Sequence, residues 1–411
     1  MPNPRKYELY GQAFRQHAHE VFAQMRREDP VFQQPGLDGK TPIWFITRYA
    51  EVEQVLRDDQ RFVRDPALAL SPEVLEQFFE GSDPQVMAMT NNHMLNKDGK
   101  DHHRLRMLVS KAFTRPVIQG MRPRIAEIAE EILDGVEGRG QMELVNEYAF
   151  PLPIIVIAEL LGIPTQDRDK FRTWSNAVVT PVLTEEEQQE SARLLREFVA
   201  YMQELVARRR ENPEDDLLSG LIQAEEQGDR LSESELFSML TLLIVAGHET
   251  TVTLISNAVL ALLRNPAQLQ TLIDQPEAMV QAVEELLRYD SPVERALTRW
   301  VAEDVELAGQ QLQRGDLIIA VLGSANRDEN HFEDPTELDL TRNPNQHLAF
   351  GKGAHYCLGS PLARLEAEIA LNTLFQRFPD LALNIAPEDL AYRDVPLFRS
   401  LKQLPVRWTP K

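Results

Sequence analysis

The feature that most constrains the fold is a long apolar segment near the middle of the chain. Ser232 and Glu235 form a capping-box pattern that starts a helix, and Asn265-Pro266 supplies a stop. The spacing predicts a helix of roughly thirty residues, on the order of 45 Å long at 1.5 Å per residue. A helix so long and so apolar must cross the interior of the protein. Its residues 246–251 (AGHETT) put small and polar side chains into a buried element, where they are costly unless used. We therefore expect something to bind there.

The remainder of the chain is also mainly helical. Apolar residues recur at three- and four-residue steps over residues 125–136 and 195–206, which indicates helices packed on a core. Strand signals are confined to three short stretches, at residues 43–47, 305–307 and 317–322. No repeat or linker divides the 411 residues, of which 43% are apolar and 26% charged. We predict one domain, residues 1–411, that is mainly α with small β-sheets.

Charge and cysteine content exclude several classes of protein. With 64 acidic against 43 basic residues and a net charge of -21, the chain is unsuited to bind nucleic acid or an anionic membrane. Its one cysteine cannot form an intramolecular disulfide, which favours a reducing compartment. The first twelve residues lack the apolar core of a signal peptide, and the strongly apolar stretch 239–247 is shorter than the roughly 20 residues that span a bilayer. We expect a cytoplasmic protein.

That cysteine lies within residues 350–359 (FGKGAHYCLG), directly before Ser360-Pro361. Two glycines let the backbone turn tightly and approach a flat partner, while Ser360 as N-cap and Pro361 at the first position begin a helix. Cys357 therefore sits at a helix N-terminus, where the macrodipole and free N–H groups favour a thiolate. Because metal ligation requires a thiolate, Cys357 is a candidate ligand to iron.

Residues 350–359 resemble the haem-binding signature of cytochrome P450 enzymes and match it at every defining position. The resemblance implies the cytochrome P450 fold, a triangular helical prism that holds haem b between the long helix and the cysteine-bearing helix. It also implies that Cys357 is the axial thiolate, whose electron donation favours O–O cleavage, and that Phe350 packs near the sulfur. Further matches run from His102 to the end of the chain, whereas the first hundred residues match only loosely.

The second match is Ala246-Gly247-His248-Glu249-Thr250, which is similar to the oxygen-activation motif of the family. Ala246 and Thr250 are four residues apart and share a helix face, which can open a groove beside dioxygen. The resemblance implies that Thr250 is the hydrogen-bonding partner of the activated oxygen and that Glu249 belongs to a proton path from solvent. Ala246 and Gly247 would lie beside the cofactor. Without the cysteine, the simpler interpretation is a threonine that bonds back to a helix carbonyl.

The third match, Glu285-Leu286-Leu287-Arg288, resembles the Glu-x-x-Arg of the family. An acid and a base three residues apart on a helix are usually a surface pair. In this family they form a buried structural network beneath the haem with an arginine from a later segment, which Arg342 would supply here. We assign Glu285 and Arg288 to structure rather than to catalysis.

Haem carries two propionates that need cationic or hydrogen-bonding partners when buried. The resemblance carries over His102 and Arg106, which lie one helical turn apart, together with Arg299 and His355. The double proline that usually precedes the histidine is replaced here by Gly99-Lys100, which changes the entry into this helix.

The resemblance implies a bacterial-type, class I monooxygenase that inserts one oxygen atom of dioxygen into an organic substrate. No nicotinamide or flavin fingerprint and no cysteine cluster is present, so a ferredoxin or flavodoxin with its NAD(P)H-dependent reductase must supply electrons. We expect a monomer. Five basic residues flank the motifs on the cysteine side and are suited to steer an acidic carrier: Arg104, Lys111, Arg115, Lys352 and Arg364.

Three other functions stay open. A peroxide-dependent peroxygenase is the near alternative, against which the Glu249-Thr250 pair argues. Cys357 with His355 as its base would instead give a haem-free hydrolase or transferase. The last is a non-catalytic haem sensor or carrier.

Family analogy places the substrate pocket among largely apolar segments, which suggests a medium to large hydrophobic molecule. The candidate wall residues are Met87, Met89, Val293, Leu297 and Phe398. Glu294 and Arg295 are candidates to recognise a polar group of the substrate, but we interpret them as exposed loop charges.

Overall fold

The computed structural model describes residues 6–79, 87, 91–111, 113–164, 167, 170, 171, 173, 174, 177, 184–214, 216–226 and 229–410. The helices are α1 (Gly11–Gln16), α2 (Ala18–Glu28), α3 (Tyr49–Arg57), α4 (Pro72–Phe78), α6 (Gly99–Ser110), α7 (Arg115–Gly120), α8 (Arg122–Asp134), α9 (Pro151–Leu160), α11 (Glu185–Glu211), α12 (Leu217–Gln223), α13 (Glu233–Leu263), α14 (Pro266–Asp274), α15 (Met279–Tyr289), α16 (Leu322–Ala325) and α17 (Ser360–Arg377). The strands are β1 (Val31–Pro35), β2 (Pro42–Ile46), β3 (Phe62–Val63), β4 (Gln141–Glu143), β5 (Glu225–Glu226), β6 (Asp229–Arg230), β7 (Arg299–Val301), β8 (Val305–Leu307), β9 (Gln310–Leu312), β10 (Leu317–Ala320), β11 (Ala382–Leu383) and β12 (Pro405–Arg407). The prediction of a mainly α protein with small sheets is confirmed.

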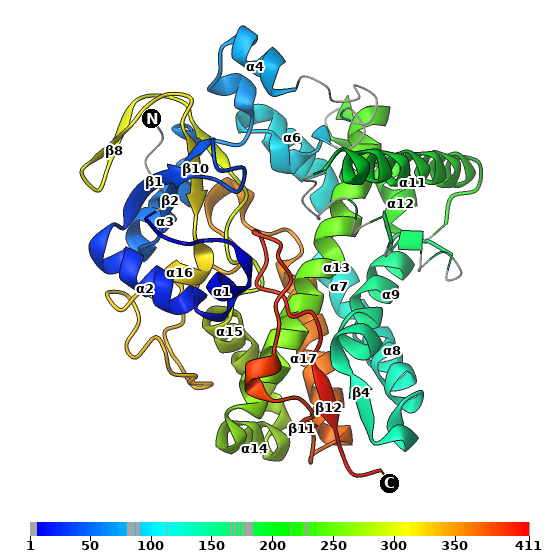
Figure 1. Cartoon of the computed structure of the whole chain (residues 1–411). Helices are drawn as coiled ribbons and strands as arrows, with labels where there is room; N and C mark the ends of the chain where they lie inside the picture. The colour runs from blue at the N-terminus through cyan, green and yellow to red at the C-terminus, as the bar shows by residue number, and fades with distance from the viewer. Residues whose placement is uncertain are drawn as a thin grey trace.

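Helix α13 is the long central helix that the sequence predicts (Figure 1). Its capping box is present, because Ser232 Oγ accepts from Glu235 N at 3.3 Å and Glu235 Oε2 accepts from Ser232 N at 2.8 Å. It packs against α9, α15 and α17. Within the described part of the chain it is the one helix long and apolar enough to cross a membrane, and most of that stretch is buried inside the fold.

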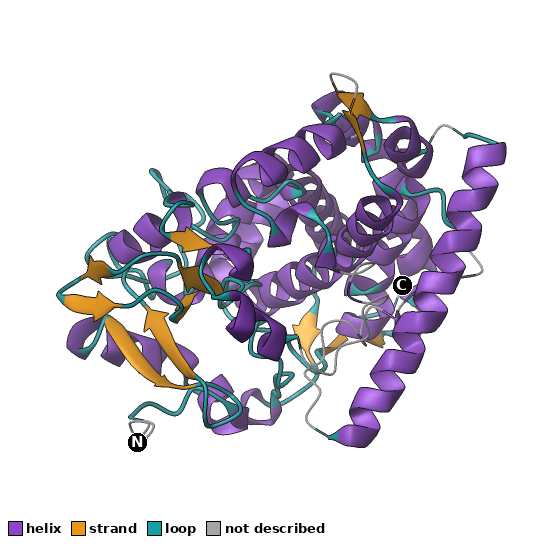
Figure 2. Cartoon of the chain, turned by 90° about the horizontal axis from the view of Figure 1, so that it is seen from above, coloured by secondary structure: helices purple, strands orange, loops and turns teal. Residues whose placement is uncertain are grey.

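One group of strands lies at one side of the molecule, most helices lie at the other, and further short strands lie among the helices (Figure 2). The largest sheet has the order β1-β2-β10-β7-β3. The β10–β2 pair is parallel, and the other three pairs are antiparallel. The predicted strand at residues 305–307 does not join this sheet. It forms the hairpin β8-β9, whose turn holds Ala308 and Gly309 at positive φ.

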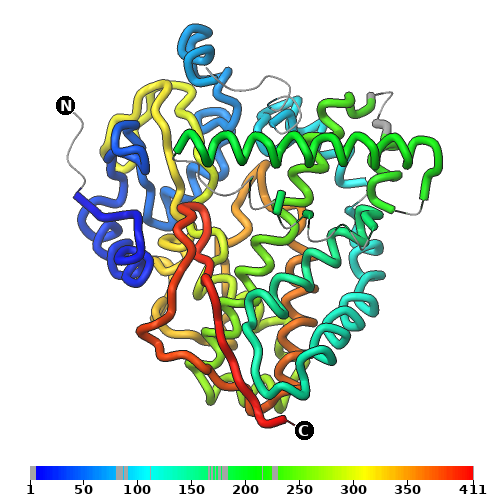
Figure 3. The backbone as a smooth tube through the Cα atoms, turned by 45° about the vertical axis from the view of Figure 1, so that its right-hand side comes forward, coloured from blue at the N-terminus to red at the C-terminus, as the bar shows by residue number. Residues whose placement is uncertain are grey.

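The apolar stripes at residues 125–136 and 195–206 are core, as predicted. The first supplies α8 to a core shared with α13, α15 and α17, and the second supplies α11 to a core shared with α9 and α13. Figure 3 shows α11 as the long helix that crosses the helical side, and the C-terminal segment beside the N-terminal part. A hydrogen bond of 2.8 Å from Gln12 Nε2 to the carbonyl of Tyr392 joins these two ends of the chain.

Candidate active site

Cys357 lies in a tight loop immediately before α17. Its backbone N–H donates to the carbonyl of Phe350 at 3.0 Å, which closes the loop. Gly353 has φ +71°, and an added Cβ would come 2.6 Å from the carbonyl oxygen of Leu56, so no other residue fits there. The helix begins at Ser360 with Gly359 as N-cap. The prediction that Ser360 is the N-cap is therefore wrong by one residue.

The surroundings of the Cys357 sulfur act on its charge in opposite directions. Burial raises the pKa of the thiol above its ordinary value. The backbone N–H groups of Gly359 and Ser360 and the guanidinium of Arg106 favour the thiolate, but burial is the larger effect. A metal cation at the sulfur would supply the positive charge that a thiolate needs here.

A buried histidine lies near the cysteine loop with an unused nitrogen. His102, on α6, is 4% exposed, and its Nε2 has no hydrogen-bond partner. Its ring centroid is 4.3 Å from that of His355, and burial lowers the pKa of His102 to about 4. One helical turn later, Arg106 Nη2 donates to the carbonyl of Tyr356 at 2.7 Å. The sequence-predicted pair His102 and Arg106 thus borders the cysteine loop.

His355 and Arg299 join His102 and Arg106 to make the basic group of four side chains. His355 also contacts an acid, Asp98, that the sequence did not reveal. His355 Nε2 lies 3.2 Å from Asp98 Oδ1, and Asp98 also accepts from the backbone N–H of Arg64 at 2.6 Å. Arg299, on β7, is 3% exposed and donates from Nη1 to the carbonyl of Phe62 at 2.8 Å. Burial lowers the pKa of both Arg299 and His355. The one signal for Asp98 is its place just before α6, where an acid is a usual N-cap, but its carboxylate turns to other partners.

This group fits haem b. His102, Arg106 and His355 border the cysteine loop, Arg299 lies close enough to His355 to help lower its pKa, and one of the buried imidazole nitrogens is unpartnered. Two propionates are the kind of anions that such donors hold. Across the described ranges, no three His, Cys, Asp or Glu side chains form a cluster that could hold a metal ion by themselves. An iron at Cys357 would need the ring nitrogens of the porphyrin as its other ligands.

Helix α13 leaves Ala246 and Thr250 uncovered by other side chains, at the position where the sequence predicts binding. These two residues are called the bare surface of α13. Ala246 is exposed and Thr250 is half-exposed on a helix whose side chains are otherwise mostly buried. Thr250 Oγ1 donates to the carbonyl of Ala246 at 3.0 Å, which leaves the hydroxyl oxygen able to accept. Gly247 has a different reason to be small, because an added Cβ would come 3.1 Å from Ile157 on α9. The structure thus assigns Gly247 to helix packing.

Glu249 is buried and ion-paired. The side chain of Glu249 is 3% exposed, and its Oε2 accepts from Arg393 Nη1 at 2.7 Å. Arg393 comes from the C-terminal segment and is 28% exposed, so it connects the buried acid with the surface. His248 lies fully buried with Nδ1 2.8 Å from the carbonyl of Ile244, away from the bare surface. Sequence reasoning missed Arg393, because nothing local marks it.

Glu285 and Arg288 form a buried, doubly bonded ion pair on α15. Arg288 Nε and Nη2 each donate to a carboxylate oxygen of Glu285 at 2.8 Å, and the two side chains are 1% and 0% exposed. Arg342 Nε lies 3.2 Å from Glu285 Oε2, and Asn345 Nδ2 donates to the same oxygen at 3.1 Å. Arg288 also donates to the backbone carbonyls of residues 326, 335 and 337. The network ties α15 to the long irregular segment that precedes the cysteine loop.

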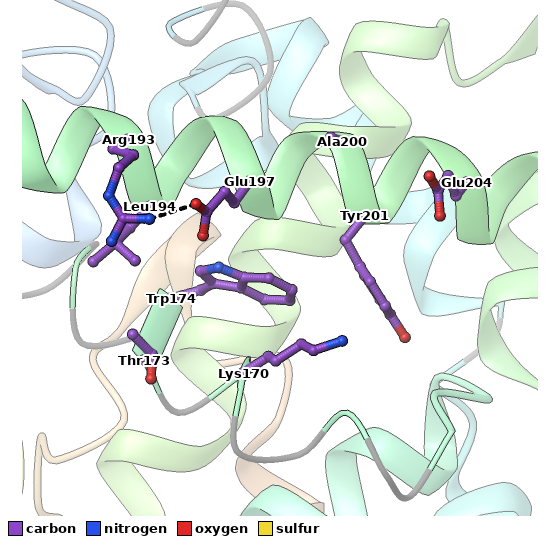
Figure 4. A pocket seen from close by; sticks show the side chains of 9 residues that line it. All are labelled: Lys170, Thr173, Trp174, Arg193, Leu194, Glu197, Ala200, Tyr201 and Glu204. Atoms are coloured by element: carbon purple, nitrogen blue, oxygen red, sulfur yellow. Dashed lines mark hydrogen bonds and ion pairs between the residues drawn. The ribbon is translucent and has the colours of Figure 1, made fainter.

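The predicted pocket residues have mixed surroundings. Leu297 is 38% exposed, Val293 is half-buried and bridges to buried Phe398, and Met87 is half-buried. Met89 lies outside the described residues. A groove of about 580 Å³ lies between α11 and Lys170, Thr173 and Trp174, around the rings of Trp174 and Tyr201 (Figure 4), and none of the five candidate wall residues lines it.

The structure corrects the prediction for Glu294 and Arg295 and gives acidic partners to three of the cations predicted to steer an electron carrier. Glu294 and Arg295 are 1% and 2% exposed, so the interpretation as exposed loop charges is wrong. Among the cations predicted to steer an electron carrier, three have acidic partners: Arg104 with Glu235, Lys352 with Glu53, and Arg364 with Glu284. Lys111 and Arg115 are exposed.

Glu366, on α17, is a buried acid that the sequence did not single out. It is 1% exposed, and neither carboxyl oxygen makes a hydrogen bond of ordinary geometry. Burial raises its pKa well above the usual range and outweighs the opposing effect of the nearby Thr251 hydroxyl. The folded protein therefore keeps a proton that the unfolded chain loses near pH ~4.3. Above that pH the unfolded state binds fewer protons, so the free energy of unfolding falls by about 1.4 kcal/mol per pH unit until the folded pKa is reached.

In Glu366→Gln, the free energy of unfolding is expected to decrease less with rising pH than in the wild type, because the amide cannot ionise. The variant should therefore be more stable than the wild type at neutral pH. Urea unfolding of the wild type and Glu366→Gln at several pH values from about 5 to about 8 measures the slope. Glu368→Gln, which removes a surface carboxylate paired with Arg122 on the same helix, is the control and should keep the wild-type slope. Equal slopes for the wild type and Glu366→Gln would contradict the prediction.

Comparison with known proteins agrees with this site. The cytochrome P450 family model matches residues 165–382. Cytochrome P450 107B1 of Saccharopolyspora erythraea is 45% identical over 400 residues, covering 97% of this chain and 96% of that protein. The solved structure of the Bacillus subtilis bacillaene polyketide synthase cytochrome P450 PksS has a TM-score of 0.90 at 42% identity, covering 98% of this chain and 100% of that one. Myxobacterial cytochrome P450 CYP267B1, solved in complex with myristic acid, has a TM-score of 0.92 at 41% identity, covering 98% of each chain.

These likenesses extend over nearly the whole chain, and they confirm the predicted cytochrome P450 fold and haem b as cofactor. The chain belongs to the cytochrome P450 family of haem-thiolate monooxygenases.

Proposed function

We propose that this monooxygenase binds haem b through Cys357 and hydroxylates or epoxidises a medium to large hydrophobic molecule. The observation that carries the proposal is the convergence of four basic side chains on a cysteine loop at the start of α17, with an unpartnered nitrogen on His102. When bound, haem with a thiolate ligand activates dioxygen, and electron donation from sulfur favours O–O cleavage.

The residues have separate roles in this proposal. His102, Arg106, Arg299 and His355 hold the propionates, and Asp98 orients His355 through the 3.2 Å contact. Phe350 packs beside the cysteine loop, where the guanidinium of Arg364 lies 4.4 Å from its ring centroid. Together these contacts fix the loop that carries the sulfur.

Thr250 and Glu249 handle oxygen and protons. The Thr250 hydroxyl already donates to Ala246, so its free lone pairs accept a proton donor at the bare surface of α13. When the bond from Arg393 Nη1 to Glu249 Oε2 opens, this oxygen takes up a proton from solvent. Glu249 then serves as the buried acid that supplies protons on the side of Thr250. Glu285 and Arg288 hold the fold and take no part in the chemistry.

The substrate class rests on the exposed Leu297 and on two relatives. The relative PksS is named for polyketide biosynthesis, and CYP267B1 was solved in complex with myristic acid. Myristic acid is a long, largely apolar molecule. A pocket walled by apolar side chains such as Leu297 and Phe398 would suit such a substrate.

Electrons come, in this proposal, from a ferredoxin or flavodoxin and its NAD(P)H-dependent reductase. The exposed Lys111 and Arg115 support docking of an acidic carrier on a chain whose net charge is otherwise -21. The lone cysteine and the acidic composition support a monomer in the cytoplasm.

The proposal is tested by Thr250→Ala with Thr253→Ala as its matched control. Both hydroxyls donate to the carbonyl four residues back, Thr250 at 3.0 Å and Thr253 at 2.9 Å, but Thr253 is buried. Positioned proton transfer typically contributes about 10²–10⁴-fold, so Thr250→Ala should lower partner-driven product formation by about 100-fold or more. Product formed per NAD(P)H consumed, with myristic acid as the probe, is the measurement.

Thr253→Ala should behave like the wild type in this assay. A peroxygenase would show the opposite pattern, in which peroxide drives turnover of the wild type better than the redox partner does and Thr250→Ala leaves both rates unchanged. Such a result would replace the monooxygenase reaction with the peroxide-dependent one.

A further inference from the structure

The short N-terminal helix α1 carries a buried arginine, Arg15, that bonds to the interior. Arg15 is 0% exposed, and its guanidinium reaches two distant segments at once. Nη1 donates to Glu294 Oε1 at 3.1 Å, and Nη2 donates to the carbonyl of Val395 at 2.7 Å. Arg15 therefore bonds to residues that lie 279 and 380 positions further along the chain.

The two segments that Arg15 joins also pair with each other. The backbone N–H of Glu294 donates to the carbonyl of Leu397 at 3.0 Å, and Val293 bridges to Phe398. Next along the chain come Leu297, whose side chain is 38% exposed, and Arg299 of the basic group beside Cys357. A shift of Glu294 would move Leu297, because only two residues separate them. Residues 293–297 and 395–398 form one unit, here called the wall.

Two more arginines tie the wall to the N-terminal segment. Arg295 Nη2 donates to the carbonyl of Leu9 at 2.5 Å, and its guanidinium lies 5.1 Å from the ring centroid of Tyr10. Arg399 Nη1 donates to the carbonyl of Arg15 at 2.8 Å. Glu294 accepts from Arg15 and lies 3.3 Å from Arg295, so its charge is shared between one guanidinium from α1 and one from the wall.

Removal of Arg15 leaves a specific defect. Glu294 keeps Arg295 as a cationic partner, so its buried charge is not stranded and the protein can still fold. The carbonyl of Val395 loses its donor, and the one side chain of α1 that bonds to both halves of the wall is lost, while the bonds from Arg295 and Arg399 to the N-terminal segment remain. The expected consequence is a wall that moves, rather than a chain that unfolds.

We propose that Arg15 is a positioning residue for the substrate pocket, which holds residues 293–297 and 395–398 at fixed spacing and so sets the space beside Leu297. This inference rests on the proposed function, because the wall borders a substrate only if the chain binds haem beside it. Across the described ranges, the hydrogen bonds and ion pairs of the Arg15 side chain reach neither the cysteine loop nor the bare surface of α13, so it acts through the wall alone.

The test compares Arg15→Met with Arg26→Met in the haem-loaded full-length protein. Arg26, on α2, is a matched control, because it is 4% exposed and also anchors an N-terminal helix. Its Nε lies 2.9 Å from Glu329 Oε2, and Nη1 donates to the carbonyl of Ser324 at 3.2 Å, with no contact to the wall. Arg15→Lys, which keeps the charge but cannot fork to two acceptors, is the second variant.

Two readouts separate the inference from the proposed function. Hydrogen exchange of the backbone N–H groups of residues 294–296 reports the wall directly, and Arg15→Met should accelerate it by about tenfold or more. Binding of phenylimidazole and of imidazole, followed by the haem absorption shift, reports the pocket. We expect weaker phenylimidazole binding in Arg15→Met by about tenfold, with Arg15→Lys intermediate and imidazole unchanged, since only the larger probe reaches the wall.

Equal exchange rates at residues 294–296 in Arg15→Met and Arg26→Met would overturn the proposal, and so would equal phenylimidazole affinities. If Arg15→Met accumulates no folded protein, the same comparison between Arg15→Lys and Arg26→Met decides. Failure of the proposed function looks different, because the wild type itself would then show no azole-induced shift while the exchange result still stood.

Discussion

Cys357→Ser is expected to abolish the strongly red-shifted Soret band that the dithionite-reduced wild type should show with carbon monoxide. Cys357 is the only cysteine of the chain, so no other thiolate can replace it. Loss of an outer-shell partner at a metal site typically costs about 10–100-fold, and loss of the ligand itself should exceed this. We expect partner-driven product formation to fall by more than about 100-fold. The absorption spectrum with and without carbon monoxide, together with haem content, is the measurement.

Cys357→His separates loss of the thiolate from loss of haem. An imidazole at this position can still ligate iron, so this variant should retain haem but show a carbon monoxide band without the red shift. The four basic residues remain in both variants, and some haem uptake should therefore survive. A red-shifted band that persists in Cys357→Ser would show that the sulfur is not the ligand and would remove the basis of the proposed site.

Local patterns carried most of what the sequence predicted. The capping box at Ser232 and Glu235 gave the start of α13, because both of its hydrogen bonds lie within four residues. The cysteine loop is equally local, since the N–H of Cys357 bonds to the carbonyl of Phe350 and the helix starts within three residues of Cys357. The error at Ser360 is one residue, which is the usual uncertainty at a helix end.

Partners far apart along the chain could not be predicted. Glu294 and Arg295 look like loop charges in sequence, and only the fold brings Arg15 to Glu294 from 279 residues away. Arg393 reaches Glu249 over 144 residues, and Asp98 reaches His355 over 257. The resemblance predicts Gly247 beside the cofactor, but it cannot predict the contact with Ile157, which depends on how α9 crosses α13. In each case the sequence shows one residue of a contact but does not identify the distant residue that it contacts.

Sequence spacing also could not rank two identical motifs. The chain contains Glu285-x-x-Arg288 on α15 and Glu190-x-x-Arg193 on α11, with the same residue types at the same spacing. The first pair is 1% and 0% exposed, whereas the second is 55% and 51% exposed. Burial alone therefore decides that one pair organises an interior network and that the other is a solvated surface pair.

Glu285→Ala is accordingly expected to destabilise the fold by about 3–5 kcal/mol, because it leaves Arg288 buried without its counter-charge and removes the acceptor of Arg342. That is a large part of the roughly 5–15 kcal/mol by which a typical protein is stable, so haem-loaded protein should accumulate poorly at higher temperature. Glu190→Ala is the matched control and should leave the unfolding midpoint almost unchanged. Urea unfolding of both variants at one pH gives the comparison. If Glu285→Ala unfolds at the same urea concentration as Glu190→Ala, the buried network does not stabilise the fold, and the role of Glu285 must then lie in the site itself.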